Sequence, residues 1–481
     1  MLVGILFLAL LVQGINSASA PLQLQNISNT TDERNGTILL NHSNSEVIDN
    51  RVYGWVDGPD TRGTLDILWS SLFTIFICTY TMLCLNVPAM DERLWRIMGR
   101  KIFWMGIAIA GPEFVLTIAS GQWGTARESV ALFHSSGFTE WTLRHGFFAD
   151  MGGFFVVPRV ENEQYDRPFP VTSKQLHWLV KNKYLPFPDT REEDMADKSK
   201  QDTIAKIITS FQVGYLMLQC IGRILQHLAI TTLELSALAI VACSILTSIC
   251  WLQKPLDVRT PIRLTLNASI GEIRRDRSLD TEDWKHTPLD FVDDLGPTWN
   301  FNVQKFMSMP LPPYHERPVP RFGNDRFPNL KGAQETYLCF ATLGYAAIHL
   351  AGWNWKFPTH VELILWRVSS LFLFGTTVLF WVFETTAAWH RRGRWNRLFN
   401  YFSSNQTKRM AAESARARLA QQSNNKPKVL PLPAEFWSIL PLAVLYGAAR
   451  GYLVVEVFMG LRSLEPSAYA VVNWTAFLPH V

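Results

Sequence analysis

Long apolar stretches alternate with polar ones along this 481-residue chain, and the longest lies at residues 207–251. Its only formal charges are those of Arg223 and Glu234. As a single helix it would be about 68 Å long, roughly twice the hydrocarbon thickness of a bilayer. We therefore expect a hairpin of two membrane-spanning helices that turns between Gly222 and Leu228.

Four further apolar stretches are each long enough for one membrane span. They cover residues 67–88, 335–353, 361–390 and 436–461. Lys206 and Lys254 flank the hairpin, as interfacial anchors do. The pattern predicts an all-α polytopic membrane protein with about six to seven transmembrane helices.

Residues 102–120 are also apolar, but Gly111, Pro112 and Glu113 interrupt their middle. Proline removes a backbone donor and clashes with the preceding helical turn. A carboxylate at mid-membrane is costly. We expect either a kinked second span or a re-entrant pair of half-helices.

The charge distribution favours the re-entrant alternative. Ten Lys and Arg residues face only Glu413 between residues 391 and 428, and such an excess marks the cytosolic side. A basic segment at 391–434 stays inside if six helices cross fully and residues 102–120 enter and leave on one side. Both chain ends then lie outside; a seven-span arrangement is the alternative.

The N-terminal residues predict entry into the secretory pathway, ending in the endoplasmic reticulum or the plasma membrane. Residues 1–20 pair an apolar core with small residues, which is typical of a signal peptide. Residues 21–64 form a polar tail that we expect to be disordered, lumenal and glycosylated. Its four N-x-S/T sequons begin at Asn26, Asn29, Asn35 and Asn41.

Two segments between the spans, 121–204 and 253–334, are nearly balanced in charge, and the second is rich in proline. We expect two mostly cytosolic loop layers, the second one extended. The remaining segments are a first span with the interrupted segment at 65–120, the hairpin at 205–252, two spans at 335–390, the last span at 435–461 and a C-terminal tail at 462–481.

Composition narrows the classes of function. A hydrophobic share of 48% with 18% charged residues fits a chain of which about a third lies in lipid. A net charge of +4 argues against a nucleic-acid partner. The six cysteines lie inside apolar runs without metal-binding spacing. Nucleotide and protease motifs are absent, so we expect no catalytic residue, metal or cofactor.

Charged residues inside the apolar stretches are the candidates for a functional site, because lipid penalises them unless they pair or line a cavity. They are Glu113, Arg223, Glu234, Glu384, Arg450 and Glu456. We expect Arg450 to pair with a carboxylate inside the bundle. His349, near a predicted helix end, is interpreted as an interfacial hydrogen-bonding residue.

A possible lipid-binding segment lies at residues 391–402, where aromatic residues at helical spacing adjoin an arginine cluster. A helix of this kind can lie on anionic headgroups with its aromatic face toward the acyl chains. A plain topological anchor explains it equally well. The residues that would face the lipid are Arg391, Arg392, Arg394, Trp395, Arg397 and Phe399.

Several motifs support a resemblance that extends over nearly the whole chain after Tyr53. They are GWVDGPDTRGTLDILWSS, AGPEF, HGFFADMGGFF, ICWLQKPLDV and WTAFLPHV. The chain resembles a large family of uncharacterised fungal multi-pass membrane proteins. The resemblance implies a fungal source and a shared membrane architecture, and it implies no catalytic residues.

Three functions remain open from the sequence. The first expectation is a non-enzymatic membrane protein that binds a ligand or a protein partner as a sensor or scaffold. The second is a transporter or channel that uses the buried carboxylates. The third is a lipid-modifying membrane enzyme. Membrane lipids are the one partner class that the composition itself predicts.

Overall fold

The computed structural model describes ten segments of the chain: residues 54–56, 58, 62–159, 167–190, 195, 201–277, 286–292, 318–324, 333–391 and 432–477. The expected signal peptide lies outside these segments. So do the four tail sequons at Asn26, Asn29, Asn35 and Asn41.

The described part of the chain is mostly helical. Its longer helices are α2 (Thr64–Met82), α3 (Leu94–Ala110), α4 (Pro112–Ser135), α8 (Gln201–Leu225), α9 (Thr232–Cys250), α11 (Ala333–Leu350), α12 (His360–Arg391) and α15 (Leu432–Met459). The shorter ones are α5 (Leu143–Asp150), α6 (Ser173–Lys181), α10 (Ile270–Arg275) and α16 (Pro466–Tyr469), with 3-10 turns η3 (Gly460–Arg462) and η4 (Trp474–Phe477).

Five helical stretches are long and apolar enough to cross a membrane, which is compatible with an integral membrane protein. They are Thr64–Met82, Ile207–Leu225, Thr232–Cys250, His360–Phe383 and Leu440–Arg462. Two of them coincide with the expected hairpin. The sixth expected span, 335–353, is the helix α11, which packs in the bundle against α4, α9 and α12. Polar residues such as Gln334, Glu335 and His349 make α11 less apolar than the five.

The interrupted segment forms two helices, α3 and α4, which meet at 110°. Gly111 lies at the break because a Cβ atom there would stand 2.6 Å from the Phe114 ring. Pro112 then begins α4, where its missing N–H is harmless. The far ends of both helices lie toward the same end of the bundle. Lys101 of α3 pairs with Asp257, beyond the end of α9, and α4 continues to α5 and α6.

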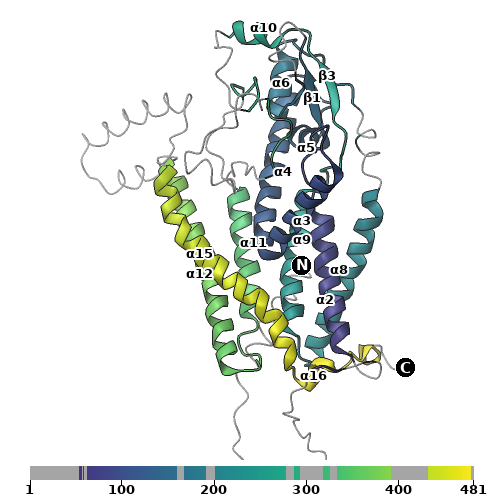
Figure 1. Cartoon of the computed structure of the whole chain (residues 1–481), viewed down its shortest axis with the longest axis vertical. Helices are drawn as coiled ribbons and strands as arrows, with labels where there is room; N and C mark the ends of the chain where they lie inside the picture. The colour runs from purple at the N-terminus through teal and green to yellow at the C-terminus, as the bar shows by residue number, and fades with distance from the viewer. Residues whose placement is uncertain are drawn as a thin grey trace, which may run out of the picture.

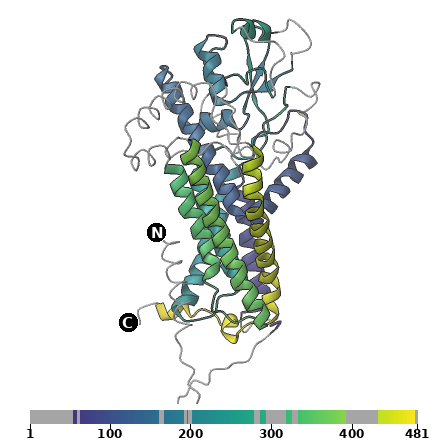
Figure 2. The ribbon, with the colours of Figure 1, turned by 90° about the vertical axis from the view of Figure 1, so that its left-hand side faces the viewer.

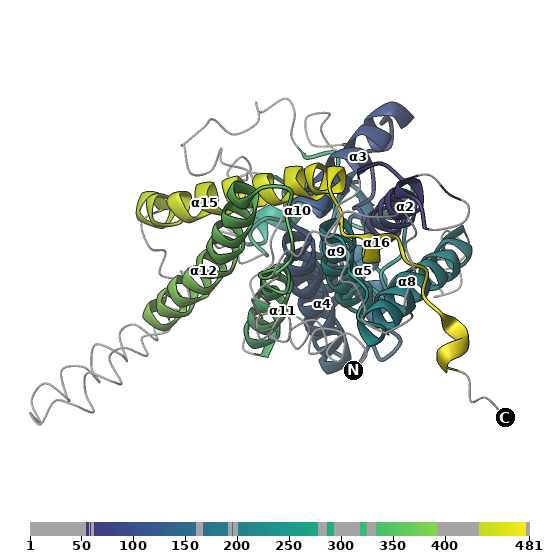
Figure 3. The ribbon, with the colours of Figure 1, turned by 90° about the horizontal axis from the view of Figure 1, so that it is seen from below.

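The helix α9 is the centre of the bundle (Figure 3). It is apolar on all sides, and a helix of that kind is stable only when it is surrounded. It packs mainly against α2 and α4, and also against α11 and α15. The hairpin partner α8 contacts α2 more extensively than α9. Polar bonds help to hold α8 there, such as that from Gln212 Nε2 to Thr74 Oγ1 at 3.0 Å.

A small sheet lies at one end of the bundle, beside α5, α6 and α10 (Figure 1). It contains β1 (Phe154–Val157), β2 (Phe169–Pro170) and β3 (Ile262–Thr265), in the order β2-β1-β3. The pair β1–β2 is antiparallel, and β1–β3 is parallel with Phe154 opposite Ile262. We call these strands and short helices the capping layer.

The sheet changes the expected picture of an all-α chain with two loop layers. The strand β1 comes from the first expected layer and β3 from the second, so the two segments join in one body. This body has an apolar core of its own, formed by side chains such as Trp141, Phe154, Phe169, Leu176 and Ile273. The capping layer lies at one end of the bundle, and α16 lies at the other (Figures 1 and 2).

Candidate functional site

The break between α3 and α4 leaves backbone groups inside the bundle without helical partners, as every helix end does. Arg450 of α15 meets two of them. Its Nε donates to the carbonyl oxygen of Ala110 at 2.9 Å, and its Nη2 donates to that of Ile109 at 2.9 Å. Arg450 is 4% exposed. A cation thus lies at the negative end of the α3 dipole.

The same guanidinium reaches α11. Its Nη1 lies 2.9 Å from Nε2 of His349, and its centre lies 5.5 Å from the ring of Tyr345. Because a guanidinium can only donate, Nε2 must accept, and the proton of a neutral His349 resides on Nδ1. Nδ1 faces the Tyr345 carbonyl oxygen at 3.3 Å. His349 is fully buried, so its interpretation as an interfacial residue is wrong.

Glu113 stands on the other side of the break, in the first turn of α4. Its side chain is buried, and its Oε1 accepts a hydrogen bond from the hydroxyl of Tyr446 of α15. Its Oε2 is buried and has no hydrogen-bond partner among the described residues. An anion near a helix N-terminus is favourable. The two half-helix ends are therefore compensated by opposite charges: α15 supplies the positive one, Arg450, and contacts the negative one, Glu113, through Tyr446.

The prediction that Arg450 pairs with a carboxylate is wrong. Of the described residues, two carbonyl groups and one imidazole bond to the guanidinium, and no carboxylate lies within ion-pair distance of it. The physical reason is the helix break, which supplies two carbonyl acceptors that an unbroken helix would have used. Glu113 acts on Arg450 only through space.

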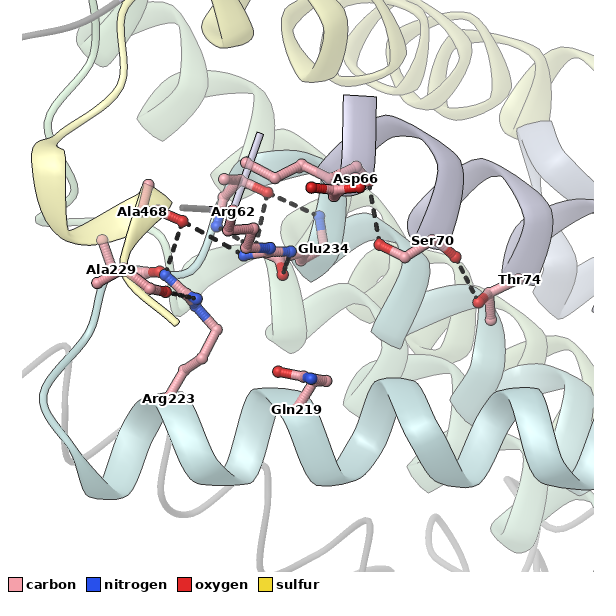
Figure 4. A network of polar contacts seen from close by, with 12 residues as sticks. Arg62, Asp66, Ser70, Thr74, Gln219, Arg223, Ala229, Glu234 and Ala468 are labelled. Atoms are coloured by element: carbon pink, nitrogen blue, oxygen red, sulfur yellow. Dashed lines mark hydrogen bonds and ion pairs between the residues drawn. The ribbon is translucent and has the colours of Figure 1, made fainter. Parts of the chain in front are cut away.

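A second polar cluster joins residues beside α2, α8, α9 and α16 (Figure 4). It lies at the end of the bundle where α16 is found, opposite the capping layer (Figure 1). Arg62, just before α2, forms an ion pair of 2.5 Å with Glu234 in the first turn of α9. The other oxygen of Glu234 accepts from the backbone N–H of Thr231 at 2.9 Å, which completes a capping box. The sequence had singled out Glu234 without its partner Arg62.

Arg223, near the end of α8, completes this cluster, which we call the α16 clasp. It is fully buried, and within the described part of the chain its guanidinium donates to carbonyl oxygens. Nε bonds to Ala229 at 2.8 Å, Nη2 to Ser467 at 2.7 Å and Nη1 to Ala470 at 2.9 Å. Arg223 therefore ties α16 to the α8–α9 turn, and its contacts favour a structural role.

The remaining candidates lie apart from the break. Glu456 of α15 is 2% exposed and accepts from the Tyr452 hydroxyl at 3.0 Å, while its Oε1 is buried without a partner among the described residues. Glu384 lies in α12, but its side chain is outside the described part, as is that of Arg391. The other expected lipid-facing residues, Arg392, Arg394, Trp395, Arg397 and Phe399, lie outside the described residues.

Lys254 also departs from expectation. It was interpreted as an interfacial anchor, yet it is 3% exposed at the junction between the bundle and the capping layer. Its Nζ donates to the Cys84 carbonyl oxygen at 2.6 Å and to Gln122 Oε1 at 2.8 Å, and it lies 4.6 Å from the Trp251 ring. Burial lowers the pKa of Lys254 to about 8, with partial opposition from Cys84 and Asp150.

No group of three or more His, Cys, Asp or Glu side chains among the described residues could hold a metal ion. The candidates predicted from the sequence include both charges at the break, Glu113 and Arg450. They do not include His349, Tyr345 and Tyr446, which contact these charges. Tyr446 stands four residues before Arg450, and Tyr345 four before His349. That spacing places each pair on one helix face and was the available signal.

Comparison with known proteins identifies one family. The model of a family of unknown function (DUF8562) matches residues 36–273 and 330–481. The match covers both halves of the α3–α4 pair, the hairpin and α15. Searches of the curated proteins and of the solved structures returned no match.

Proposed function

Because the chain belongs to this family of unknown function, we propose its role from the candidate site: it is a transporter or channel that moves a small cation, with Glu113 as the cation-binding group. The sequence alone had favoured a sensor or scaffold. The geometry of the α3–α4 break supports the second expectation instead.

One observation carries the proposal. The helices α3 and α4 meet at 110° inside an apolar bundle, and at their junction stands a buried carboxylate with one oxygen that has no partner among the described residues. Discontinuous helices whose ends meet at mid-membrane commonly form the ion and substrate sites of transporters. An ionisable residue inside a bundle is, for the same reason, a functional hypothesis by default.

The surroundings of Glu113 support binding of a positive charge. Oε1 is occupied by the Tyr446 hydroxyl, so an arriving proton or cation meets Oε2. Ionised Glu113 balances the nearby charge of Arg450, and neutralisation of the carboxylate removes that balance. Since Tyr446 and Arg450 both belong to α15, a change of charge at Glu113 acts directly on the packing of α15 against the break.

The test is cation flux into liposomes that contain the purified protein, with proton and sodium gradients as separate arms. Glu113→Gln keeps the size of the side chain and an acceptor for Tyr446, but it removes the charge. Flux in one arm should fall at least tenfold in this variant.

Glu456→Gln is the matched control. Glu456 is also a buried glutamate of the bundle that accepts from a tyrosine four residues away, but it lies apart from the break. Its flux should stay within twofold of the wild type. Equal flux in wild type and Glu113→Gln, or no protein-dependent flux in either arm, would refute the proposal.

A further inference from the structure

We propose that Asn473 is an acceptor for an N-linked glycan. It begins the sequon Asn473-Trp474-Thr475 near the C-terminal end of the chain. A sequon by itself is weak evidence. The folded geometry of these three residues, and the end of the bundle at which they lie, carry the inference.

The sequon is exposed and already turned toward its own threonine. Asn473, Trp474 and Thr475 are all exposed residues. Asn473 Oδ1 accepts hydrogen bonds from Thr475 Oγ1 at 2.6 Å and from the Thr475 backbone N–H at 3.2 Å. Within the described part of the chain, the Nδ2 amide of Asn473 has no acceptor. Its reactive nitrogen is therefore available.

Neighbouring residues hold the segment while the Asn473 amide stays clear of the bundle. A Cβ atom on Gly222 of α8 would stand 2.8 Å from Val472 and 3.2 Å from Trp474, so both side chains lie against α8. The backbone of Asn473 is bound by Gln226, which donates to its carbonyl oxygen at 2.7 Å and accepts from its N–H at 2.9 Å.

The sequon lies at the same end of the bundle as the chain that follows the N-terminal tail. The Arg62 N–H donates to the Tyr469 carbonyl oxygen at 3.1 Å, and the Tyr469 hydroxyl donates to the Gly54 carbonyl oxygen at 2.5 Å. If the signal peptide delivers the tail to the lumen, the contacts of Gly54 and Arg62 with Tyr469 bring Asn473 there too.

Asn267 provides an internal comparison. It also begins a sequon, Asn267-Ala268-Ser269, and it is exposed. It follows β3 in the capping layer, however, at the other end of the bundle. Its serine is also buried, because Ser269 Oγ caps α10 and accepts from the Glu272 N–H at 3.2 Å, whereas Thr475 is exposed. If a bilayer surrounds the bundle, it separates the two sequons, and only one of them faces the transferase.

The modification is a substitution at the first sugar carbon of an oligosaccharide linked to a lipid pyrophosphate. The bond from Asn473 Nδ2 to that carbon forms, and the bond from the carbon to the pyrophosphate oxygen breaks. The lipid pyrophosphate leaves with the bonding electrons. One Nδ2 proton passes to a base of the transferase, and no oxidant or reductant is required.

The experiment uses the full chain, expressed in a eukaryotic host, with Asn26, Asn29, Asn35 and Asn41 all changed to Gln. Treatment with a peptide N-glycosidase in ¹⁸O-labelled water converts a glycosylated Asn into labelled Asp, which mass spectrometry locates. We expect one labelled site, at Asn473, and a gel shift equal to one glycan.

Matched variants test the assignment. Asn473→Gln and Thr475→Ala should each abolish the shift, and Thr475→Ser should retain it because the hydroxyl remains. Asn267→Gln should leave it unchanged. Label at Asn267 in place of Asn473, or an unmodified Asn473 in protein that reaches the membrane, would overturn the proposal.

Discussion

Arg450 illustrates why a guanidinium suits the break between α3 and α4. Its planar fork directs separate N–H groups at two successive carbonyl oxygens and at the His349 ring. A lysine is a compact point charge that cannot reproduce this geometry. The sequence predicted a buried charge that needs a partner. It could not predict that two backbone carbonyl groups are the partners, because these groups lack helical partners only where the helix breaks at Gly111.

His349 shows a different limit of prediction at the same scale. Its partner Arg450 is 101 residues away in the chain. A histidine near the end of an apolar stretch reads as interfacial unless the contacts of the neighbouring helices are known. The Arg62–Glu234 pair was missed for the same reason, since 172 residues separate its members. The sequence thus predicted which charged residues are buried, but it did not predict the residues that they contact.

Lys254 leads to a prediction about pH. Burial lowers the pKa of this amine from 10.5 to about 8. Between these values the unfolded chain binds more protons than the folded protein, so folding stability rises as pH increases from 8 to 10.5. At 1.36 kcal/mol for each pKa unit, the gain is about 3 kcal/mol. Below pH 8 both states are protonated, and the stability contribution of Lys254 is constant.

Thermal unfolding in detergent across this pH range would test the effect. Relative to Lys254→Met, the wild type should gain stability as pH rises. The exposed Lys174 of α6 provides the control, since Lys174→Met should track the wild type at every pH. Parallel pH profiles for wild type and Lys254→Met would contradict the prediction.

At the scale of elements, the apolar stretches predicted most helices because hydrophobic length is a strong signal. The neighbours of each helix were not predictable. The hairpin of α8 and α9 was predicted, but the sequence did not indicate that α2 packs extensively against both of its helices. The strands were missed because β1 has four residues and β2 only two, too short for a repeating pattern.

The C-terminal segment lies so close to Gly222 of α8 that one added methyl group there should displace it. Gly222→Ala would place a Cβ atom 2.8 Å from Val472 Cγ1. We expect this overpacking to cost about 1–3 kcal/mol and to release residues 471–477 from α8. Faster amide hydrogen exchange at Asn473, whose N–H bonds to Gln226, would report the release.

Gly214 is the matched control for that substitution. It lies in the same helix, and a Cβ atom there would meet nothing within 4 Å. Gly214→Ala should leave exchange at Asn473 unchanged and, by helix propensity, should stabilise α8 by up to about 1 kcal/mol. Equal exchange rates in the two variants would argue against a packing role for Gly222.

For the whole molecule, the structure places the capping layer and α16 at opposite ends of the bundle (Figure 1). Single added cysteines can test whether a membrane lies between them. Thr139, in the turn after α4, and Val471, after α16, are both exposed. Five native cysteines are buried and Cys339 is partly buried, so background labelling should be low.

We expect an impermeant maleimide to label Val471→Cys on intact cells or, for protein in the endoplasmic reticulum, only from the lumenal side. Thr139→Cys should react only from the cytosolic side. The native chain, without an added cysteine, measures the background. Reaction of both cysteines from one side would contradict a bundle that crosses the bilayer between the two ends.

The parallel pairing of β1 with β3 has a consequence for biosynthesis. Phe154 pairs with Ile262, and the difference of 108 positions includes both helices of the hairpin. At about 5–20 residues per second, the ribosome needs roughly 5–20 s to synthesise the second partner after the first. During that interval the edge of β1 that pairs with β3 stays open. The half-made capping layer therefore carries an unpaired strand edge, the kind of edge that can associate with other chains, until β3 has been synthesised.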